Sequence, residues 1–203
     1  MNYQLELDKI IESLGGYRPR LLLHACCAPC SSYVLEYLTA YFDIDLFFYN
    51  PNIMPAEEYA RRLEALHKLL AVMPCAAGVR LIEGPREEEV FLESVRGRES
   101  EPEGGARCPI CFSLRLGKAA ELCREGGYDF FTTTLTISPH KNAELINEIG
   151  EREAAARSVR WLPCDFKKRN GYLRSIELCR EYGIYRQSWC GCRLAPGDER
   201  IGP

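Results

Sequence analysis

Several common features are scarce or missing in this sequence. No apolar run approaches the ~18 residues that a membrane-spanning helix needs. The first residues, 1–4, contain neither a basic region nor a long apolar stretch, which argues against a secretory signal. The net charge is −3, so overall charge does not suggest a nucleic-acid partner. With 46% hydrophobic and 27% charged residues, we expect one soluble, cytoplasmic domain over residues 1–203, with no membrane partner.

Cysteine, by contrast, is abundant. The chain has 11 cysteines, an odd number, whereas a domain built on disulfides is usually shorter, exported and even-numbered. Clustered thiols in a reducing compartment bind metal or perform redox chemistry more often. Seven cysteines form three tight groups, at 26–30 (CCAPC), 108–111 (CPIC) and 190–192 (CGC). The isolated ones, which we expect to pack in the interior, are Cys75, Cys123, Cys164 and Cys179.

Short apolar runs alternate with amphipathic segments along the chain. Strands are expected at 20–25, 43–49, 79–82, 128–133 and 159–162. Helices are expected at 31–41 with Ser31 or Ser32 as cap, from Pro55 onward, and at 86–95, 108–126, 141–156 and 172–182. Segment 97–107 is polar and rich in turn residues, and is expected to be a mobile loop. This alternation predicts an α/β sandwich around a mostly parallel sheet.

The first cysteine group and the loop at 132–140 both follow predicted strands. Ligands bind at the carboxyl ends of strands in such sheets, so both segments are expected at a single site. Four thiolates, from Cys26, Cys27, Cys108 and Cys111, would complete the ligand set of a [4Fe–4S] cluster. A structural Cys₄ zinc site and metal-free redox thiols are the alternatives.

The third cysteine group differs from the other two. Cys190 and Cys192 can form a strained, easily reduced disulfide, because Gly191 eases the backbone geometry of such a ring. Alternatively, one of these thiols ligates a metal. His24 lies two residues before Cys26 and is either a satisfied interior histidine or a neighbour of the metal site.

Charge is distributed unevenly along the chain. Residues 157–193 carry a balance of +6, whereas residues 1–156 carry −8. This basic C-terminal segment is either a polyanion-binding face or a solvated helix surface. Residues 138–142 (SPHKN) place His140, Lys141 and Asn142 near an expected helix start, where anions bind well. Residues 165–172 (DFKKRNGY) mix basic and aromatic side chains, as nucleic-acid sites do.

Together these segments resemble the epoxyqueuosine reductase QueH family. The matching stretches are 22–30 (LLHACCAPC), 49–52 (YNPN), 107–115 (RCPICFSLR), 130–150 (FFTTTLTISPHKNAELINEIG), 162–177 (LPCDFKKRNGYLRSIE) and 182–192 (YGIYRQSWCGC). They extend over nearly the whole chain. Cys164 and Trp189 depart from the expected pattern, but neither is a proposed ligand.

The resemblance implies a Rossmann-like domain related to adenine-nucleotide α-hydrolases. It also implies the last step of queuosine synthesis, the reductive removal of the epoxide oxygen of epoxyqueuosine in tRNA. Carried over by position, Cys26, Cys27, Cys108 and Cys111 would hold a [4Fe–4S] cluster, and Cys190 and Cys192 would form the redox-active pair. The family is associated with a second metal, an iron or another divalent ion, for which Cys30 is the first candidate ligand.

The implied reaction needs a proton donor, a tRNA contact surface and an electron donor that the sequence does not identify. His24 and His140 are the candidate proton donors. The anticodon stem-loop would contact the basic segment and the loop before it, through Lys141, Asn142, Lys167, Lys168, Arg169, Tyr172, Arg174 and Arg186.

Two other functions account for part of the sequence. A zinc-stabilised RNA-binding module explains the thiols and the basic segment, but it does not explain the vicinal Cys26–Cys27 pair together with a CxC pair. An iron–sulfur tRNA sulfur-transfer enzyme would need a glycine-rich loop after the first strand. Residues 26–32 (CCAPCSS) contain no glycine there.

Overall fold

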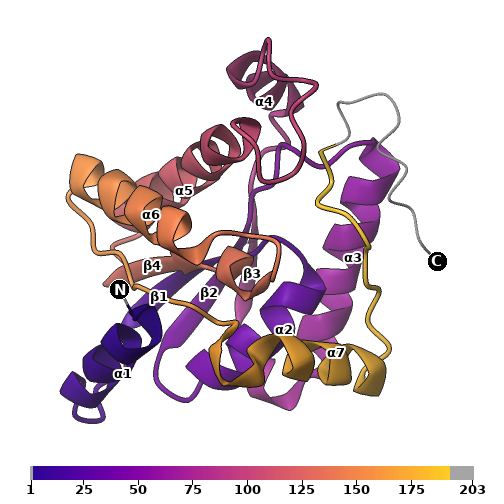
Figure 1. The fold of residues 1–203 in the computed structure, drawn as a ribbon. Helices are drawn as coiled ribbons and strands as arrows, with labels where there is room; N and C mark the ends of the chain where they lie inside the picture. Colours follow the sequence, from indigo (N-terminus) through magenta and orange to yellow (C-terminus); the bar gives the residue numbers. More distant parts are fainter. Residues whose placement is uncertain (1, 193–203) are drawn as a thin grey trace.

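A computed structural model describes residues 2–192 of the chain, and its centre is a four-stranded, all-parallel sheet (Figure 1). The strands are β1 (Arg20–His24), β2 (Asp43–Phe48), β3 (Arg80–Glu83) and β4 (Phe130–Thr133), in the spatial order β3-β2-β1-β4. β1 is central and pairs in parallel with β2 and β4. The α/β sandwich predicted from the sequence and the Rossmann-like fold implied by the resemblance are confirmed.

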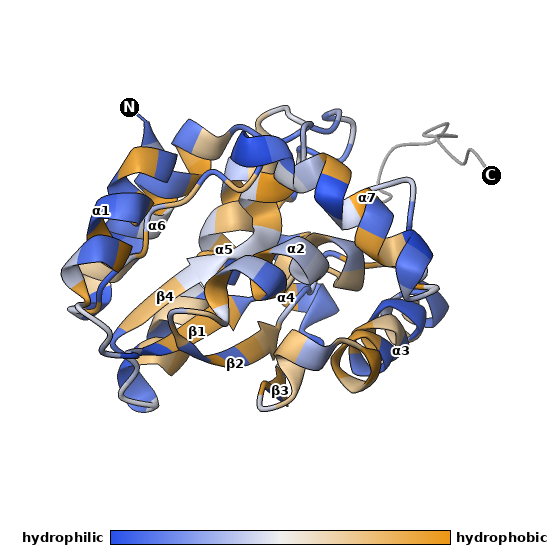
Figure 2. Cartoon of the chain, turned by 90° about the horizontal axis from the view of Figure 1, so that it is seen from below, coloured by the Kyte–Doolittle hydropathy of each residue, from blue (hydrophilic) through white to orange (hydrophobic). Residues whose placement is uncertain are grey.

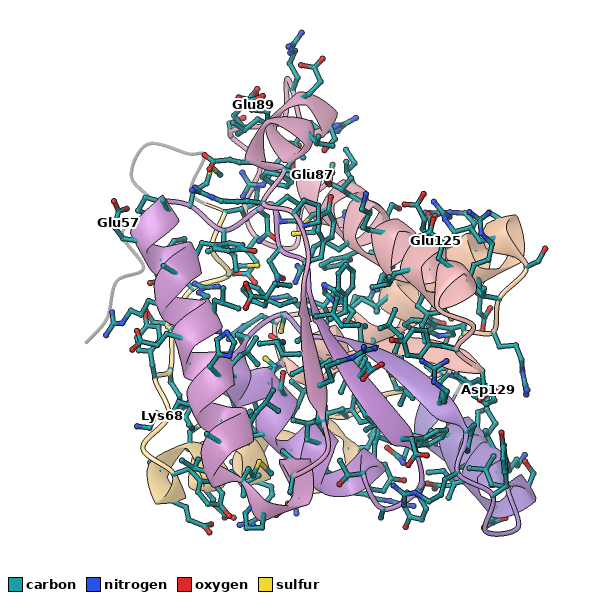
Figure 3. All side chains as sticks on the ribbon, turned by 180° about the vertical axis from the view of Figure 1, so that it is seen from behind. Glu57, Lys68, Glu87, Glu89, Glu125 and Asp129 are labelled. Carbon is teal, nitrogen blue, oxygen red and sulfur yellow. The ribbon has the colours of Figure 1, made fainter. Side chains whose placement is uncertain are left out.

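Helices cover the sheet, and the buried parts of its strands are mainly apolar. Leu21, Leu22 and Leu23 of β1 are all fully buried, as are Phe131 of β4 and Phe48 of β2. Such continuous apolar runs are typical of parallel strands that are covered on both faces. In Figure 2 the strands are coloured mainly as hydrophobic, whereas the helices alternate between hydrophobic and hydrophilic residues. Figure 3 shows charged side chains at the periphery, among them Glu57 and Lys68 on one helix.

The helices form two groups. One group contains α2 (Ala28–Leu38), α3 (Ala56–Val72) and α7 (Gly171–Glu181), and the other contains α5 (Arg107–Glu125) and α6 (Ala143–Arg157). Figure 1 shows the two groups on opposite sides of the sheet. The chain moves outward from β1 to β2 and β3 and then returns to place β4 beside β1. The sheet therefore has its switch point between β1 and β4, where ligands bind in folds of this type.

The remaining elements are short or lie at the edges. α1 (Tyr3–Ser13), for which the sequence analysis made no prediction, is capped by Asn2, whose side chain accepts from Leu5 N–H. α4 (Glu88–Ser94) precedes α5, and 3₁₀ turns occur at Pro74–Ala76, Thr134–Ile137 and Lys168–Asn170. No helix within residues 2–192 is long and apolar enough to span a membrane.

Three sequence predictions are wrong in detail. α2 begins at Ala28, because Cys27 is its cap and Pro29 occupies the first turn; the Ser31 and Ser32 hydroxyls instead donate back to the carbonyls of Cys27 and Pro29. Segment 159–162 makes only an isolated bridge between Trp161 and Phe131. Cys75 is exposed, whereas Cys123, Cys164 and Cys179 are buried as expected.

Candidate metal and redox site

Three thiols meet where β1 ends and α2 begins. The Sγ atoms of Cys26, Cys27 and Cys30 all lie within 4.8 Å of one another, and 3.7 Å separates those of Cys26 and Cys27. They converge because α2 starts early, which places Cys30 in its first turn beside the vicinal pair. In the part of the chain that the structure describes, no other set of three or more histidine, cysteine or acidic side chains is as tight.

The three thiols differ in acidity. Hydrogen bonds from Cys27 and Cys30 hold the pKa of Cys26 well below its usual range. Burial raises the pKa of Cys27 to about 12, and its hydrogen bond to the Cys26 thiolate adds to this shift. The same hydrogen bonding raises the pKa of Cys30. Cys26 is thus the most easily ionised of the three thiols, and a bound cation is needed to ionise all three.

The second pair, Cys108 and Cys111, lies in the first turns of α5. Both thiols are buried, and the Cys108 Sγ accepts from Gly104 N–H at 3.2 Å. Burial raises the pKa of both thiols, that of Cys111 to about 11. Cys111 packs in a small cluster with Phe91, Val95 and Cys192, which brings the end of the described chain next to α5.

Cys190 and Cys192 are held by backbone contacts. Gly191 has a φ of +114°, a conformation that favours glycine, and its carbonyl accepts from Met54 N–H at 3.0 Å. A hydrogen bond from Cys192 lowers the pKa of Cys190 to about 5, and Lys141 and Arg115 support its thiolate. All the cysteines are free, so the structure describes the pair as two thiols.

Three buried arginines surround these cysteines, and the sequence analysis assigned a role to none of them. Arg62 of α3 donates to the carbonyls of Cys190 at 2.8 Å and Trp189 at 3.0 Å, and pairs with Glu58 at 2.6 Å. Arg107 donates to the Sγ of Cys192 at 3.6 Å, and Arg115 to that of Cys111 at 3.9 Å. The only sequence signal was the presence of Arg107 and Arg115 at the two ends of the 107–115 stretch.

A cavity of about 220 Å³ opens onto these thiols. Cys26, Cys27, Cys30 and Cys190 line it from two distant parts of the sequence. The other side chains that line it, mainly polar or aromatic, include Arg62, Glu103, Arg115, Ser138, His140, Lys141, Tyr172, Ser175, Arg186, Gln187 and Trp189. The predicted meeting of the first cysteine group with the loop after β4 therefore occurs at the switch point of the sheet.

The two candidate proton donors occupy different environments. His24 at the end of β1 is fully buried; its Nε2 donates to the Tyr49 carbonyl at 3.0 Å, so Nδ1 accepts from the Thr133 hydroxyl at 2.8 Å. Burial, with a contribution from Arg115, lowers the pKa of His24 to about 3. The imidazole of His24 is therefore neutral, and both of its nitrogens are hydrogen-bonded within the fold. His140, in contrast, is exposed and lines the cavity.

Only part of the predicted tRNA-contact set faces the cavity, namely Lys141, Tyr172 and Arg186. Several other members have partners within the fold. Asn142 caps α6 by accepting from Leu145 N–H, Arg169 pairs with Asp8 at 2.5 Å, and Arg174 pairs with Glu36 at 2.6 Å. Lys168 is exposed, whereas Arg193, the last basic residue of the 157–193 segment, lies outside the described residues.

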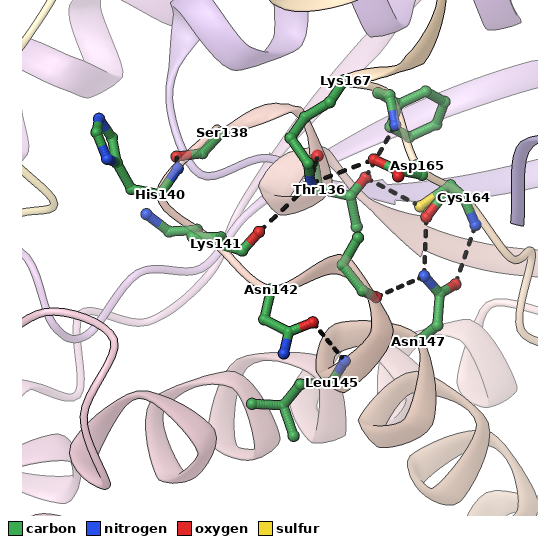
Figure 4. A network of polar contacts seen from close by, with 12 residues as sticks. Thr136, Ser138, His140, Lys141, Asn142, Leu145, Asn147, Cys164, Asp165 and Lys167 are labelled. Carbon is green, nitrogen blue, oxygen red and sulfur yellow. Dashed lines mark hydrogen bonds and ion pairs between the residues drawn. The ribbon is translucent and has the colours of Figure 1, made fainter. Parts of the chain in front are cut away.

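Contacts from Lys167, Cys164 and Asn147 fix the loop that carries His140 and Lys141 (Figure 4). Lys167 donates to the carbonyls of Thr136 at 2.9 Å and Lys141 at 3.3 Å. Asn147 bonds both the N–H and the carbonyl of Cys164, whose thiol also contacts the Thr136 hydroxyl at 3.3 Å. Cys164 is therefore a buried structural residue, and Lys167 holds the loop in place.

The cysteine thiols of this site are ligands of the kind that an iron–sulfur cluster uses. Thiolates are the ligands that such clusters use, and a cluster with four thiolates is an anion that needs compensating charge when buried. Arg107 and Arg115 are 2% exposed, and the Nε of each has no hydrogen-bond partner. Buried donors of this kind, next to thiols, match a bound anionic group.

Comparison with known proteins identifies the family of this chain. The family model described as "Epoxyqueuosine reductase QueH" matches residues 21–197. This chain belongs to the epoxyqueuosine reductase QueH family. The match runs from the second residue of β1 past the CxC pair, so it includes all the cysteine groups. The resemblance inferred from the sequence motifs is confirmed, and with it the expectation of an oxidoreductase.

Individual relatives carry the same description. The chain is 46% identical to epoxyqueuosine reductase QueH of Staphylococcus epidermidis over 99% of its length and 87% of the relative's. It is 43% identical to that of Streptococcus pyogenes, over 96% of this chain and 79% of the relative. The Thermotoga maritima protein is 37% identical, over 85% and 88% of the two chains. The similarity thus extends along most of each chain.

Proposed function

We propose that this enzyme removes the epoxide oxygen of epoxyqueuosine in tRNA by a two-electron reduction that yields queuosine, acting in the cytoplasm. The observation that carries the proposal is the cavity itself. It brings two thiols capable of redox chemistry, Cys26 and Cys190, together with Tyr172 and Arg186. Aromatic and basic side chains of this kind bind nucleic acids. Family membership supports the same reaction.

Cys26, Cys27, Cys108 and Cys111 are the residues that would hold the [4Fe–4S] cluster. Cys30, which lies within 4.8 Å of Cys26 and Cys27, would contribute to a second metal, with Cys190 or Cys192 as a possible co-ligand. When bound, these groups supply single-electron transfer and a Lewis acid for the epoxide oxygen. Arg115 and Lys141 add positive charge next to the thiolates.

The electrons and protons balance through the Cys190–Cys192 pair. The two thiols lose two electrons and two protons as their S–S bond forms. Both C–O bonds of the epoxide break, a carbon–carbon double bond forms, and the oxygen leaves as water. His140 lies at the cavity and is suited to deliver a proton, whereas the neutral, fully engaged His24 keeps β1 and β4 in register. An external electron donor then reduces the disulfide.

The tRNA would present its anticodon stem-loop to the cavity. Tyr172 can stack on an unstacked base, and Arg186 and Lys168 can contact phosphates. Lys141 pairs with Glu103 at 3.1 Å and lies against the cysteines, so we assign it to the thiolates and not to the RNA. Asn142, Lys167, Arg169 and Arg174 position the surface through their contacts within the fold.

The direct test is anaerobic purification followed by an assay on tRNA that contains epoxyqueuosine. We expect a brown protein that absorbs near ~400 nm, with about four sulfides and at least about four irons per chain. It should convert the substrate when given a chemical reductant. A Cys108→Ser variant should lose both colour and activity, whereas Cys123→Ser, a buried thiol further along α5, should keep both. A colourless protein with stoichiometric zinc would instead support the zinc-stabilised RNA-binding module.

A further inference from the structure

Arg115 is a buried cation that lies between the cysteine groups. It follows Cys111 by one turn of α5 and is 2% exposed. Its Nη1 donates to the Sγ of Cys111 at 3.9 Å, and its Nη2 donates to the Oδ1 of Asn50. The Nε has no partner. The side chain also lines the cavity, so it reaches from α5 toward the thiols that follow β1.

Arg115 lacks the compensation that the fold provides for a comparable residue. Arg62 is equally buried and has Glu58 at 2.6 Å. Among residues 2–192, no carboxylate forms an ion pair with Arg115. Guanidinium groups remain protonated in proteins, and an unpaired buried charge is costly. Its contacts are the Sγ of Cys111 at 3.9 Å and the Oδ1 of Asn50, so the anion that balances it has to come from the cysteine sulfurs or from a group that they bind.

Asn50 links this cation to the other cysteine group. Its Oδ1 accepts from Arg115, and its Nδ2 donates at 2.8 Å to the carbonyl of Ala25, the residue before Cys26. Asn50 is fully buried, so the two bonds hold α5 against the end of β1. Positive charge is thus fixed between the Cys108–Cys111 pair and the Cys26–Cys27 pair.

We propose that Arg115, braced by Asn50, is the countercharge of the thiolate-bound cluster and raises its reduction potential. Reduction adds one negative charge to the cluster, and a nearby cation in a buried environment stabilises that reduced state. Arg115 is a positioning and electrostatic residue in this proposal. The inference rests on the proposed function, because it requires that the four cysteines hold a cluster.

The test separates the effect of the positive charge of Arg115 from the effect of its hydrogen bonds. Arg115→Gln removes the charge and keeps a donor for Asn50, whereas Arg115→Lys keeps the charge and loses the planar fork. Arg157→Gln is the matched control, since it makes the same charge change where Glu153 pairs with the arginine at 2.8 Å on α6. Anaerobic redox titration of the reconstituted proteins gives the midpoint potential, and thermal unfolding of the metal-free proteins gives Tm.

In Arg115→Gln we expect the ratio of reduced to oxidised cluster at a fixed potential to fall about tenfold, which is ~59 mV for a one-electron couple. Arg115→Lys and Arg157→Gln should stay within about twofold of wild type. The metal-free Arg115→Gln protein should melt no lower than wild type, because without the cluster the buried charge is uncompensated. A purely structural arginine would not give this combination.

Each contrary result has a defined meaning. An unchanged midpoint in a fully loaded Arg115→Gln protein overturns the inference about Arg115 and leaves the proposed function intact. A Tm several degrees lower in the metal-free variant also overturns it, because Arg115 would then be a packing residue. If Arg115→Gln retains no cluster, retention by Arg115→Lys supports the charge, and loss from both variants overturns it. A wild-type protein that binds no iron overturns the inference and the proposed function together.

Discussion

At the amino-terminal edge of the sheet, arginines are paired with carboxylates, whereas at the carboxyl-terminal edge two arginines are buried without them. Arg18 pairs with Asp43 at 3.0 Å, and Arg80 pairs with Asp45 at 2.6 Å. These pairs lie at or beside a shallow cavity of about 340 Å³. At the other edge, Arg107 and Arg115 contact thiols and form no ion pair with a carboxylate among residues 2–192.

The two edges of the sheet differ in whether the described chain by itself balances their charges. The charges of the amino-terminal edge are balanced within the described chain, and several of them are solvated, so this edge needs no ligand. The carboxyl-terminal edge combines buried cations with thiols whose pKa values burial has raised, an arrangement that is balanced only when the thiols are ionised. Changes at the carboxyl-terminal edge should therefore affect chemistry, and changes at the amino-terminal edge should affect stability alone.

The largest effect is expected from the thiol pair. Cys192→Ser removes one sulfur of the proposed dithiol while leaving the four cluster cysteines in place. Multiple turnover should fall by at least about 100-fold, because the two electrons can no longer be stored as a disulfide. The colour and the four irons of the cluster should be unchanged. Cys75→Ser at the opposite cavity is the matched control and should retain full activity. Full multiple-turnover activity in Cys192→Ser would remove the dithiol from the mechanism.

A smaller effect is expected from the arginine that holds the CxC segment. Arg62→Gln loses the donors to the Trp189 and Cys190 carbonyls and leaves Glu58 without its cation. Hydrogen bonds from charged groups contribute roughly 1.5–3 kcal/mol, so we expect a comparable loss of stability and about a tenfold loss of kcat. Arg61→Gln is the control, since Arg61 is exposed and stacks on Tyr185. Equal effects in both variants would show that the hydrogen bonds of Arg62 to the Trp189 and Cys190 carbonyls do not position the thiols.

The same two edges show what the sequence could predict. Four of the five expected strands, most helices and the meeting of the first cysteine group with the loop after β4 followed from apolar runs and from the rule that parallel strands end at one edge. The buried roles of Arg62 and Arg115 could not be predicted, because arginine is usually exposed and the partners Cys190 and Asn50 lie 128 and 65 positions away in the sequence. The early start of α2 was missed because Ser31 and Ser32 are better caps by type than Cys27.

The basic segment provides a graded test of RNA contact. We expect tRNA affinity to fall linearly on a log–log plot as salt increases, because each phosphate contact releases counterions. Lys168→Ala and Arg186→Ala should each reduce that slope by about 1. Arg169→Ala should reduce it less, since Asp8 already pairs with Arg169. Filter binding or fluorescence anisotropy at several salt concentrations measures the slopes. Binding that does not respond to salt would exclude this segment as the RNA surface.

The smallest effect is expected at the amino-terminal edge. Asp45 accepts from Arg80 and from the Tyr128 hydroxyl, each at 2.6 Å, and although burial alone would raise its pKa, these partners lower it. Asp45→Asn should cost less than about 1 kcal/mol, since Arg80 is 65% exposed and solvent screens the pair. Because the folded-state pKa lies below the unfolded value, wild type should be the more stable protein at neutral pH. That difference should disappear as the pH falls below about 4, where the unfolded chain takes up the proton first. Urea unfolding across this pH range measures it, and reductase activity at neutral pH should be unchanged. A large loss of activity in Asp45→Asn would mean that the two edges of the sheet are coupled.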